Sequence, residues 1–130
     1  MKILLAVSGS ISAYKTIDLT RELTKAGHEV RIVASSGALE FTNLNIYSFL
    51  GAQEVYGPLD DFKPQNKSVL HVDLAHWSDI FVVCPASANT IAHLAHGFAK
   101  DLLQSIFLSM PKNKQTVIFP AMNVHMYDSV

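Results

Sequence analysis

Residues 80–90 read Ile-Phe-Val-Val-Cys-Pro-Ala-Ser-Ala-Asn-Thr, and this stretch decides the fold. Its first four residues are apolar and three of them are β-branched, a pattern that favours a buried strand. Pro85 lacks a backbone N–H and is predicted to end the strand, so the next helix is expected from about Ile91. Three small polar residues that favour helix starts stand between the two: Ser87, Asn89 and Thr90.

A strand that leads into a helix in this way places the helix N-terminus at the edge of the sheet where the strand ends. Free N–H groups and the positive end of the helix dipole attract anions there. The turn around Ser87 therefore suggests a docked phosphate or the polar edge of a ring. An ordinary capped turn without a ligand is the simpler explanation of this segment taken alone.

Other segments repeat the same arrangement of a predicted strand followed by small polar residues. The apolar run at 2–7 precedes Ser8-Gly9-Ser10-Ile11-Ser12, and the predicted strand at 29–34 precedes Ser35-Ser36-Gly37. A last predicted strand at 115–119 leads into Pro120-Ala121-Met122-Asn123. Right-handed crossovers bring the carboxyl ends of parallel strands to one edge, so one ligand could touch all these turns.

The turn after the first strand is weak as a nucleotide motif. Its spacing is neither G-x-G-x-x-G nor a P-loop, and Lys15 lies one turn inside the predicted helix. Gly9 allows the backbone to approach a ligand, and Ser10 can cap the helix or donate to a phosphate. A plain helix cap explains these residues equally well.

The segment between the second strand and residue 80 is less regular. Residues 38–50 have helical periodicity, as one helix or as two short ones broken around Thr42-Asn43. Residues 51–67 are polar and contain two prolines, which predicts a long surface loop with a short strand near 54–56. A short helix then starts at His71, where a histidine is commonly a surface or capping residue.

Composition limits the classes of function. With 130 residues, 49% of them hydrophobic, the chain is one domain with a sizeable core. A net charge of −1 gives no indication of the positive charge that binding to nucleic acid or an anionic membrane requires. The first residues are too short for a signal peptide and no run reaches spanning length, so a cytoplasmic protein is expected.

One cysteine, Cys84, excludes an internal disulfide, and no Cys/His spacing matches a zinc site, so no metal is expected. Cys84 is predicted to end a buried strand and to behave as a small hydrophobe rather than a catalytic thiol.

Four motifs follow one another along essentially the whole chain: Ser8-Gly9-Ser10-Ile11-Ser12-Ala13, His71-Val-Asp-Leu-Ala-His-Trp-Ser-Asp79, Pro85-Ala-Ser-Ala-Asn-Thr90 and Pro120-Ala-Met-Asn-x-x-Met126. Together they resemble those of the homo-oligomeric flavin-containing cysteine decarboxylases. The most similar branch decarboxylates 4′-phosphopantothenoylcysteine to 4′-phosphopantetheine in coenzyme A biosynthesis. The resemblance implies an α/β fold with a three-layer, doubly wound parallel sheet of the flavodoxin-like (Rossmann-like) type. It also implies a homotrimer or dodecamer with FMN near a subunit interface.

The resemblance further implies roles for individual residues. His71 becomes the catalytic histidine, and Asn123 holds the substrate carboxylate or amide with Met126 in the same pocket. The other positions surround FMN: Gly9, Ser10, Ser35, Pro85, Ala86, Ser87, Ala88, Asn89 and, near the ring, Ala121.

The family's chemistry explains these residue types. Loss of CO2 from an unactivated cysteine would leave an unstabilised carbanion, so the family first oxidises the thiol through FMN to a thioaldehyde. The thioaldehyde then accepts the electrons of the departing carboxylate. A histidine that titrates near neutrality can take a proton or position the carboxylate, and Asn123 can orient substrate without adding charge.

The resemblance has one departure, at the C-terminal end. The family uses a cysteine on a mobile flap downstream of Pro-Ala-Met-Asn, and bacterial relatives commonly continue into a ligase-like domain. Residues 1–130 are therefore interpreted as an FMN-binding decarboxylase domain without that flap and that domain. Two other functions stay open: a peptidyl-cysteine decarboxylase of the lantibiotic type and a non-catalytic flavin-binding subunit.

Overall fold

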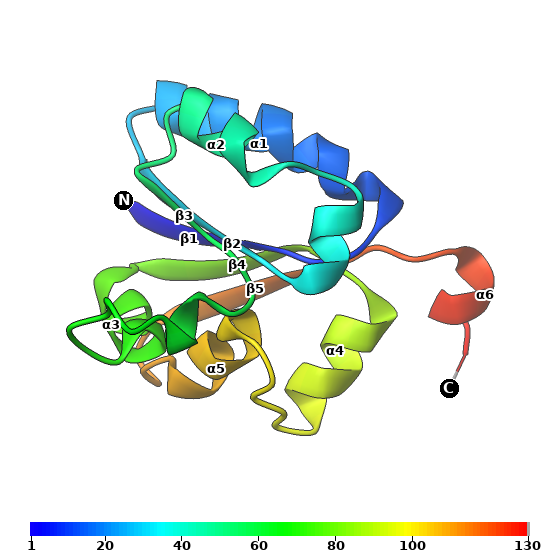
Figure 1. Cartoon of the computed structure of the whole chain (residues 1–130). Coiled ribbons are helices and arrows are strands. Elements are labelled where there is room, and N and C mark those ends of the chain that lie inside the picture. The colour runs from blue at the N-terminus through cyan, green and yellow to red at the C-terminus, as the bar shows by residue number, and fades with distance from the viewer. Residues whose placement is uncertain (130) are drawn as a thin grey trace.

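The computed structural model describes residues 1–129 of the chain, which form one parallel sheet between two layers of helices (Figure 1). The strands are β1 (Lys2–Val7), β2 (Glu29–Ala34), β3 (Glu54–Tyr56), β4 (Ile80–Ala86) and β5 (Gln115–Pro120). All neighbouring pairs are parallel, in the order β3-β2-β1-β4-β5. The order reverses between β1 and β4, which is where α/β proteins of this type bind ligands.

The helices are α1 (Lys15–Lys25), α2 (Leu44–Phe49), α3 (Leu70–Trp77), α4 (Ala88–Ala95), α5 (Leu102–Ser109) and α6 (Val124–Tyr127). The chain also forms three short 3-10 helices, one after each of the first three strands: η1 (Ile11–Tyr14), η2 (Ser36–Glu40) and η3 (Asp60–Phe62). Figure 1 shows α1 and α2 on one side of the sheet and α3, α4 and α5 on the other. The predicted three-layer doubly wound architecture is thereby confirmed.

Strand β1 has a core on each of its faces, because successive side chains of a strand point to opposite sides. Leu4 and Ala6 pack into the core beneath α3 and α5, together with Phe81. Leu5 and Val7 pack into the core beneath α1 and α2. Burial on both faces explains why β1 reads as a continuous apolar run rather than as an alternating one.

The side of the sheet that carries α1 and α2 is only partly covered at β4 and β5. Val82 of β4 pairs in register with Val117 of β5, and both side chains are half-buried. Phe119, two residues further along β5, is 51% exposed. Cys84 lies on this same face of β4 and is also half-buried. We call these side chains, with Ile80, the open face of the sheet.

The end of β4 differs from the sequence-based expectation. The strand does not stop before Pro85 but continues to Ala86, which pairs with Pro120 after a register shift. A proline is tolerated at such an irregularity because the missing N–H breaks no ladder bond there. Helix α4 accordingly begins at Ala88 and not at about Ile91. Cys84 is therefore neither the last residue of the strand nor fully buried.

Other local predictions are confirmed. The segment 38–50 is split into η2 and α2 by a break that ends at Asn43, whose side chain caps α2. The polar segment 51–67 carries β3 and η3. Among residues 1–129, the structure contains no helix with the length and apolar character needed to cross a bilayer.

Candidate functional site

Two glycines bring the turns after β1 and β2 into direct contact. A Cβ atom placed on Gly9 would lie 2.9 Å from the Cα of Gly37, which is closer than side chains approach backbone. A Cβ on Gly37 would in turn lie 3.2 Å from the Cα of Gly9. The two turns can meet at this distance only because neither residue has a side chain.

A buried hydroxyl joins the turn after β1 to the turn after β4. The Oγ of Ser8 donates to the carbonyl oxygen of Pro85 and accepts the backbone N–H of Ser87, each at 2.8 Å. The N–H of Ser8 also donates to Pro85, at 3.2 Å. Ser8 is wholly buried, so these bonds do not compete with water.

The start of α4 presents backbone donors at the same edge. Ser87 caps the helix, because its Oγ accepts the N–H of Thr90 at 3.2 Å and donates to the Thr90 hydroxyl at 3.0 Å. The hydroxyl hydrogen of Ser87 is therefore already donated to Thr90. The N–H groups of Ala88 and Asn89 belong to the first turn, where the helix itself supplies no acceptor. These two groups are free to bind an anion.

These turns surround a cavity of about 500 Å³. Its walls also come from α4, α5 and the loop before η3. The lining residues are Gly9, Ser35, Ser36, Gly37, Pro58, Leu59, Ser87, Ala88, Asn89, Thr90, His93, Lys100, Asp101, Gln104 and Met126.

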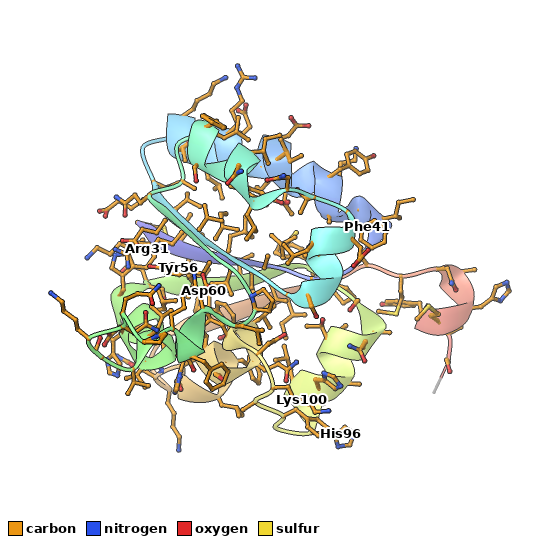
Figure 2. The ribbon with its side chains drawn as sticks, in the orientation of Figure 1. Arg31, Phe41, Tyr56, Asp60, His96 and Lys100 are labelled. Atoms are coloured by element: carbon orange, nitrogen blue, oxygen red, sulfur yellow. The ribbon has the colours of Figure 1, made fainter. Side chains whose placement is uncertain are left out.

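A second cavity, of about 550 Å³, adjoins the first and shares Gly9, Ser87, Ala88 and Met126 with it. It is mostly apolar, with the loop after β5 as one wall. Its other lining residues are Ser10, Ile11, Ser12, Phe41, Ala121, Met122 and Asn123. In Figure 2, Phe41 lies at the upper right of the view and Lys100 lies near the bottom, close to the middle.

One wall of the first cavity is a chain of polar contacts between α4 and α5. The side chain of Asp101 accepts the N–H of Gln104 at 2.9 Å, and the amide of Gln104 donates to Nδ1 of His93 at 3.1 Å. Burial raises the pKa of Asp101 above its usual 3.8, while the bond from Gln104 and the nearby His93 partly oppose this. Lys100 alone, of the lysines and arginines among residues 1–129, lines either cavity.

Most of the residues predicted for the site line these cavities. They are Gly9, Ser10, Ser35, Ser87, Ala88, Asn89, Ala121, Asn123 and Met126. Pro85 and Ala86 do not line them: both are buried behind the turn, where the carbonyl of Ala86 accepts the N–H of Ala121 at 2.9 Å. Asn123 accepts the N–H of Met126 at 2.9 Å and so also caps α6.

His71, like Pro85 and Ala86, lines neither cavity, but it lies on a different element from the turns that form them. It lies at the start of α3. Its Nδ1 is 2.7 Å from Oδ2 of Asp61 on η3, and its backbone N–H donates to Oδ1 of the same carboxylate at 3.1 Å. The imidazole is thus held by one partner and keeps its second nitrogen, Nε2, free of any hydrogen bond within residues 1–129.

The sequence did not point to the residues that complete the first cavity. His93, Lys100, Asp101 and Gln104 lie on or between helices rather than at strand ends, and Pro58 and Leu59 lie in a loop. The signal available was helical spacing: Asp101 caps α5, and Gln104 follows it by three residues, as in a capping box. That pattern predicts a helix start without predicting a ligand.

Comparison with known proteins assigns this arrangement to a family. The family model described as "Flavoprotein" matches residues 1–130. The "Probable phosphopantothenoylcysteine decarboxylase" of Streptococcus mutans is 43% identical over 129 residues, which are 98% of this chain and 71% of that protein. The "Coenzyme A biosynthesis bifunctional protein CoaBC" of Bacillus subtilis is 43% identical over 127 residues, or 97% of this chain but only 30% of that protein.

Solved structures agree. A PPC decarboxylase mutant in complex with pantothenoylaminoethenethiol superposes with a TM-score of 0.85 and 34% identity, over 98% of this chain and 70% of the other. "The FMN binding protein AtHal3" superposes with a TM-score of 0.83 and 32% identity, over 98% of this chain and 69% of the other.

Proposed function

The chain belongs to the flavoprotein family, and from this we propose that it binds FMN and decarboxylates 4′-phosphopantothenoylcysteine to 4′-phosphopantetheine. The observation that carries the proposal is the convergence of the turns after β1, β2 and β4 on two adjoining cavities. The names of the S. mutans protein and of the PPC decarboxylase structure support the choice of substrate.

The residues present fit FMN. The free N–H groups of Ala88 and Asn89 and the nearby Lys100 suit a phosphate in the first cavity. The apolar second cavity, with Met126 and Ala121 in its wall, suits a flat ring. The remaining proposed cofactor residues are Gly9, Ser10, Ser35, Ser87 and, as backing for the turn, Pro85 and Ala86.

Bound FMN supplies a two-electron acceptor for the substrate thiol. The chain's own residues hold the substrate and handle the proton. We assign proton acceptance to Nε2 of His71, which has no other partner within residues 1–129. The amide nitrogen of Asn123 is left for a substrate carboxylate, since its oxygen already caps α6. The flexible thioether of Met126 packs against the substrate in the same pocket.

We further propose that the chain acts as a homo-oligomer with the trimer as its unit. Two features support this: the open face of the sheet exposes Phe119 and half-exposes Val82 and Val117, and His71 lies outside the cavities of its own chain. A second copy seated on such a face can bring its own residues to a neighbour's cofactor. Because the B. subtilis relative is named as a coenzyme A biosynthesis protein, we propose that the reaction takes place in the cytoplasm.

Spectroscopy and product analysis test this function. The purified chain, supplied with FMN, should show a bound-flavin visible spectrum, reduce that flavin when phosphopantothenoylcysteine is added without dioxygen, and release CO2. A cysteine-ending peptide serves as the competing substrate. Preference for the peptide would replace the proposed substrate with a peptidyl one, and flavin binding without CO2 release from either would leave a non-catalytic flavoprotein.

His71→Asn separates binding from chemistry in the same assay. The variant should retain FMN and lose thiol oxidation by about two to four orders of magnitude, the usual contribution of a general acid–base group. Unchanged flavin reduction by substrate would show that His71 has a structural role only.

A further inference from the structure

The carboxylate of Asp61 makes two contacts with the same residue, His71. Oδ2 lies 2.7 Å from Nδ1 of His71, and Oδ1 accepts the backbone N–H of His71 at 3.1 Å. The Asp61 side chain is only 9% exposed, against 26% for the histidine. A carboxylate this well covered, with both oxygens on one residue, holds the imidazole at a fixed position and angle.

The loop that carries Asp61 is braced by its own side chains. Asp60 accepts the N–H of Gly57 at 2.9 Å and pairs with Lys63 at 2.9 Å. The side-chain amide of Asn66 donates to the carbonyl oxygens of Asp60 and Asp61, at 2.8 and 3.3 Å. This segment was expected to be an irregular surface loop, yet its polar residues converge to fix the backbone on both sides of Asp61.

We propose that Asp61 is a positioning residue for the reaction: it keeps His71 in the tautomer with hydrogen on Nδ1, so that Nε2 is the proton acceptor. This rests on the proposed role of His71. A carboxylate accepts only a donor, so a neutral imidazole in contact with it must carry its hydrogen on Nδ1. The proton of the substrate thiol then moves to Nε2, which leaves a thiolate and an imidazolium whose charge Asp61 balances.

A purely structural role makes a different prediction. If Asp61 served only to cap the first turn of α3 through the N–H of His71, any side chain with an oxygen in that place would do, and the tautomer would not matter. Asp61→Asn distinguishes the two roles. Its amide retains one oxygen for the backbone but can also present N–H to Nδ1, which permits the opposite tautomer.

The direct readout is the tautomer itself, measured by imidazole ¹⁵N NMR on the labelled full chain with and without FMN, at a pH where the ring is neutral. The His71 signals are assigned by their loss in His71→Asn. The wild type should show hydrogen on Nδ1 in both states, and Asp61→Asn should shift the population toward hydrogen on Nε2. The matched control is Asp73→Asn. Asp73 is an exposed carboxylate on the same helix that accepts a hydrogen bond from the Ser68 hydroxyl, and its substitution should leave the tautomer unchanged.

The second readout compares the rate of thiol oxidation with the affinity for FMN. Asp61→Asn should lower kcat for thiol oxidation at least about 10–100-fold, the range for groups that orient a metal-ligating imidazole, with the Kd for FMN within about twofold of wild type. Asp61→Glu, which keeps an acceptor, should recover part of the rate. Asp73→Asn should match wild type in both quantities.

Three results would overturn the assignment: a wild-type ring with hydrogen on Nε2, a tautomer shift in Asp61→Asn with no loss of rate, or a loss of rate with no tautomer shift. These are distinct from failure of the proposed function. A wild-type chain that binds no flavin or oxidises no thiol, or full activity in His71→Asn, would remove the reaction in which Asp61 acts.

Discussion

The Oγ of Ser8 accepts the backbone N–H of Ser87 at 2.8 Å, although the two residues are 79 positions apart in the chain. The same hydroxyl donates to Pro85. One buried side chain therefore sets the distance between the turn after β1 and the start of α4, which are two of the three turns around the first cavity. The geometry of the ligand site depends on a residue that lines neither cavity.

Ser8→Ala should weaken both the fold and the site. It removes the acceptor of the Ser87 N–H, and an unpaired buried donor costs about 1–3 kcal/mol. Urea denaturation should show that loss, and FMN titration should show a higher Kd. Ser78→Ala is the control, because its buried hydroxyl donates to the carbonyl of Ala75 away from the cavities. Ser78→Ala should lower the free energy of unfolding without changing the Kd for FMN. If both variants raised that Kd equally, the assigned role of Ser8 would be contradicted.

Gly9→Ala should separate the turns after β1 and β2. The added methyl group would meet backbone atoms of Gly37 at 2.9 Å, and neither backbone can yield cheaply. We expect a loss of about 1–3 kcal/mol, typical of overpacking, together with weaker FMN binding. At Gly57 the same substitution meets its nearest atom at 3.5 Å, so Gly57→Ala should be nearly neutral in both measurements. Wild-type FMN affinity in Gly9→Ala would show that the close approach is not needed.

Asn123→Asp should separate the two functions of that side chain. Aspartate caps helices as well as asparagine does, so the bond to the Met126 N–H and the stability of α6 should survive. The new negative charge should repel a substrate carboxylate and raise KM, while FMN absorbance stays that of the wild type. Circular dichroism checks that the stability of α6 is retained, and steady-state kinetics check that KM is raised. An unchanged KM would remove Asn123 from the substrate pocket.

Asp101→Asn should change stability in a pH-dependent way. Burial raises the folded-state pKa of Asp101 above 3.8, so its contribution to stability is fully present below 3.8 and is lost as the pH rises through the folded pKa. Asparagine keeps the cap on α5 and never ionises. The free energy of unfolding of the variant relative to wild type should therefore increase from below pH 3.8 toward neutrality. A constant difference across that range would contradict the desolvation of Asp101.

Cys84 should be a poor nucleophile at neutral pH. Burial raises the pKa of its thiol above the usual 9.0, so little thiolate is present at pH 7. Alkylation by iodoacetamide should be slower than that of glutathione at the same pH, with a rate that still rises with pH above 9.0. Labelling of Cys84 at the rate of glutathione near pH 7 would show that the open face leaves the thiol accessible and ionised.

The parts of the site that follow from strand ends could be predicted from the sequence. The predicted strands that precede Ser8-Gly9-Ser10 and Ser35 require no tertiary information, because parallel connectivity alone places the turns after them at one edge. The end of β4 could not be predicted in this way. A proline normally stops a strand, and only its pairing with β5 across a register shift shows why Pro85 lies inside this one.

The contacts between loops and helices also needed the structure. The sequence places Asp61 ten residues before His71, in a polar segment with no periodicity, and nothing local indicates that they touch. The wall formed by His93 and Gln104 depends likewise on how α4 packs against α5. Long-range side-chain pairs of this kind follow from three-dimensional packing, which single-sequence patterns do not encode.

The homo-oligomer proposed above, seated on the open face of β4 and β5, would make the stability of this chain depend on its concentration. Seating a second copy there removes Phe119 and the side chains around Val117 from water, a gain that an isolated chain lacks. By mass action, dilution then shifts the population toward lone subunits and lowers the midpoint of thermal unfolding, whereas concentration raises it. A single melting temperature would not describe the protein, and the supply of subunits would itself regulate how much folded enzyme exists.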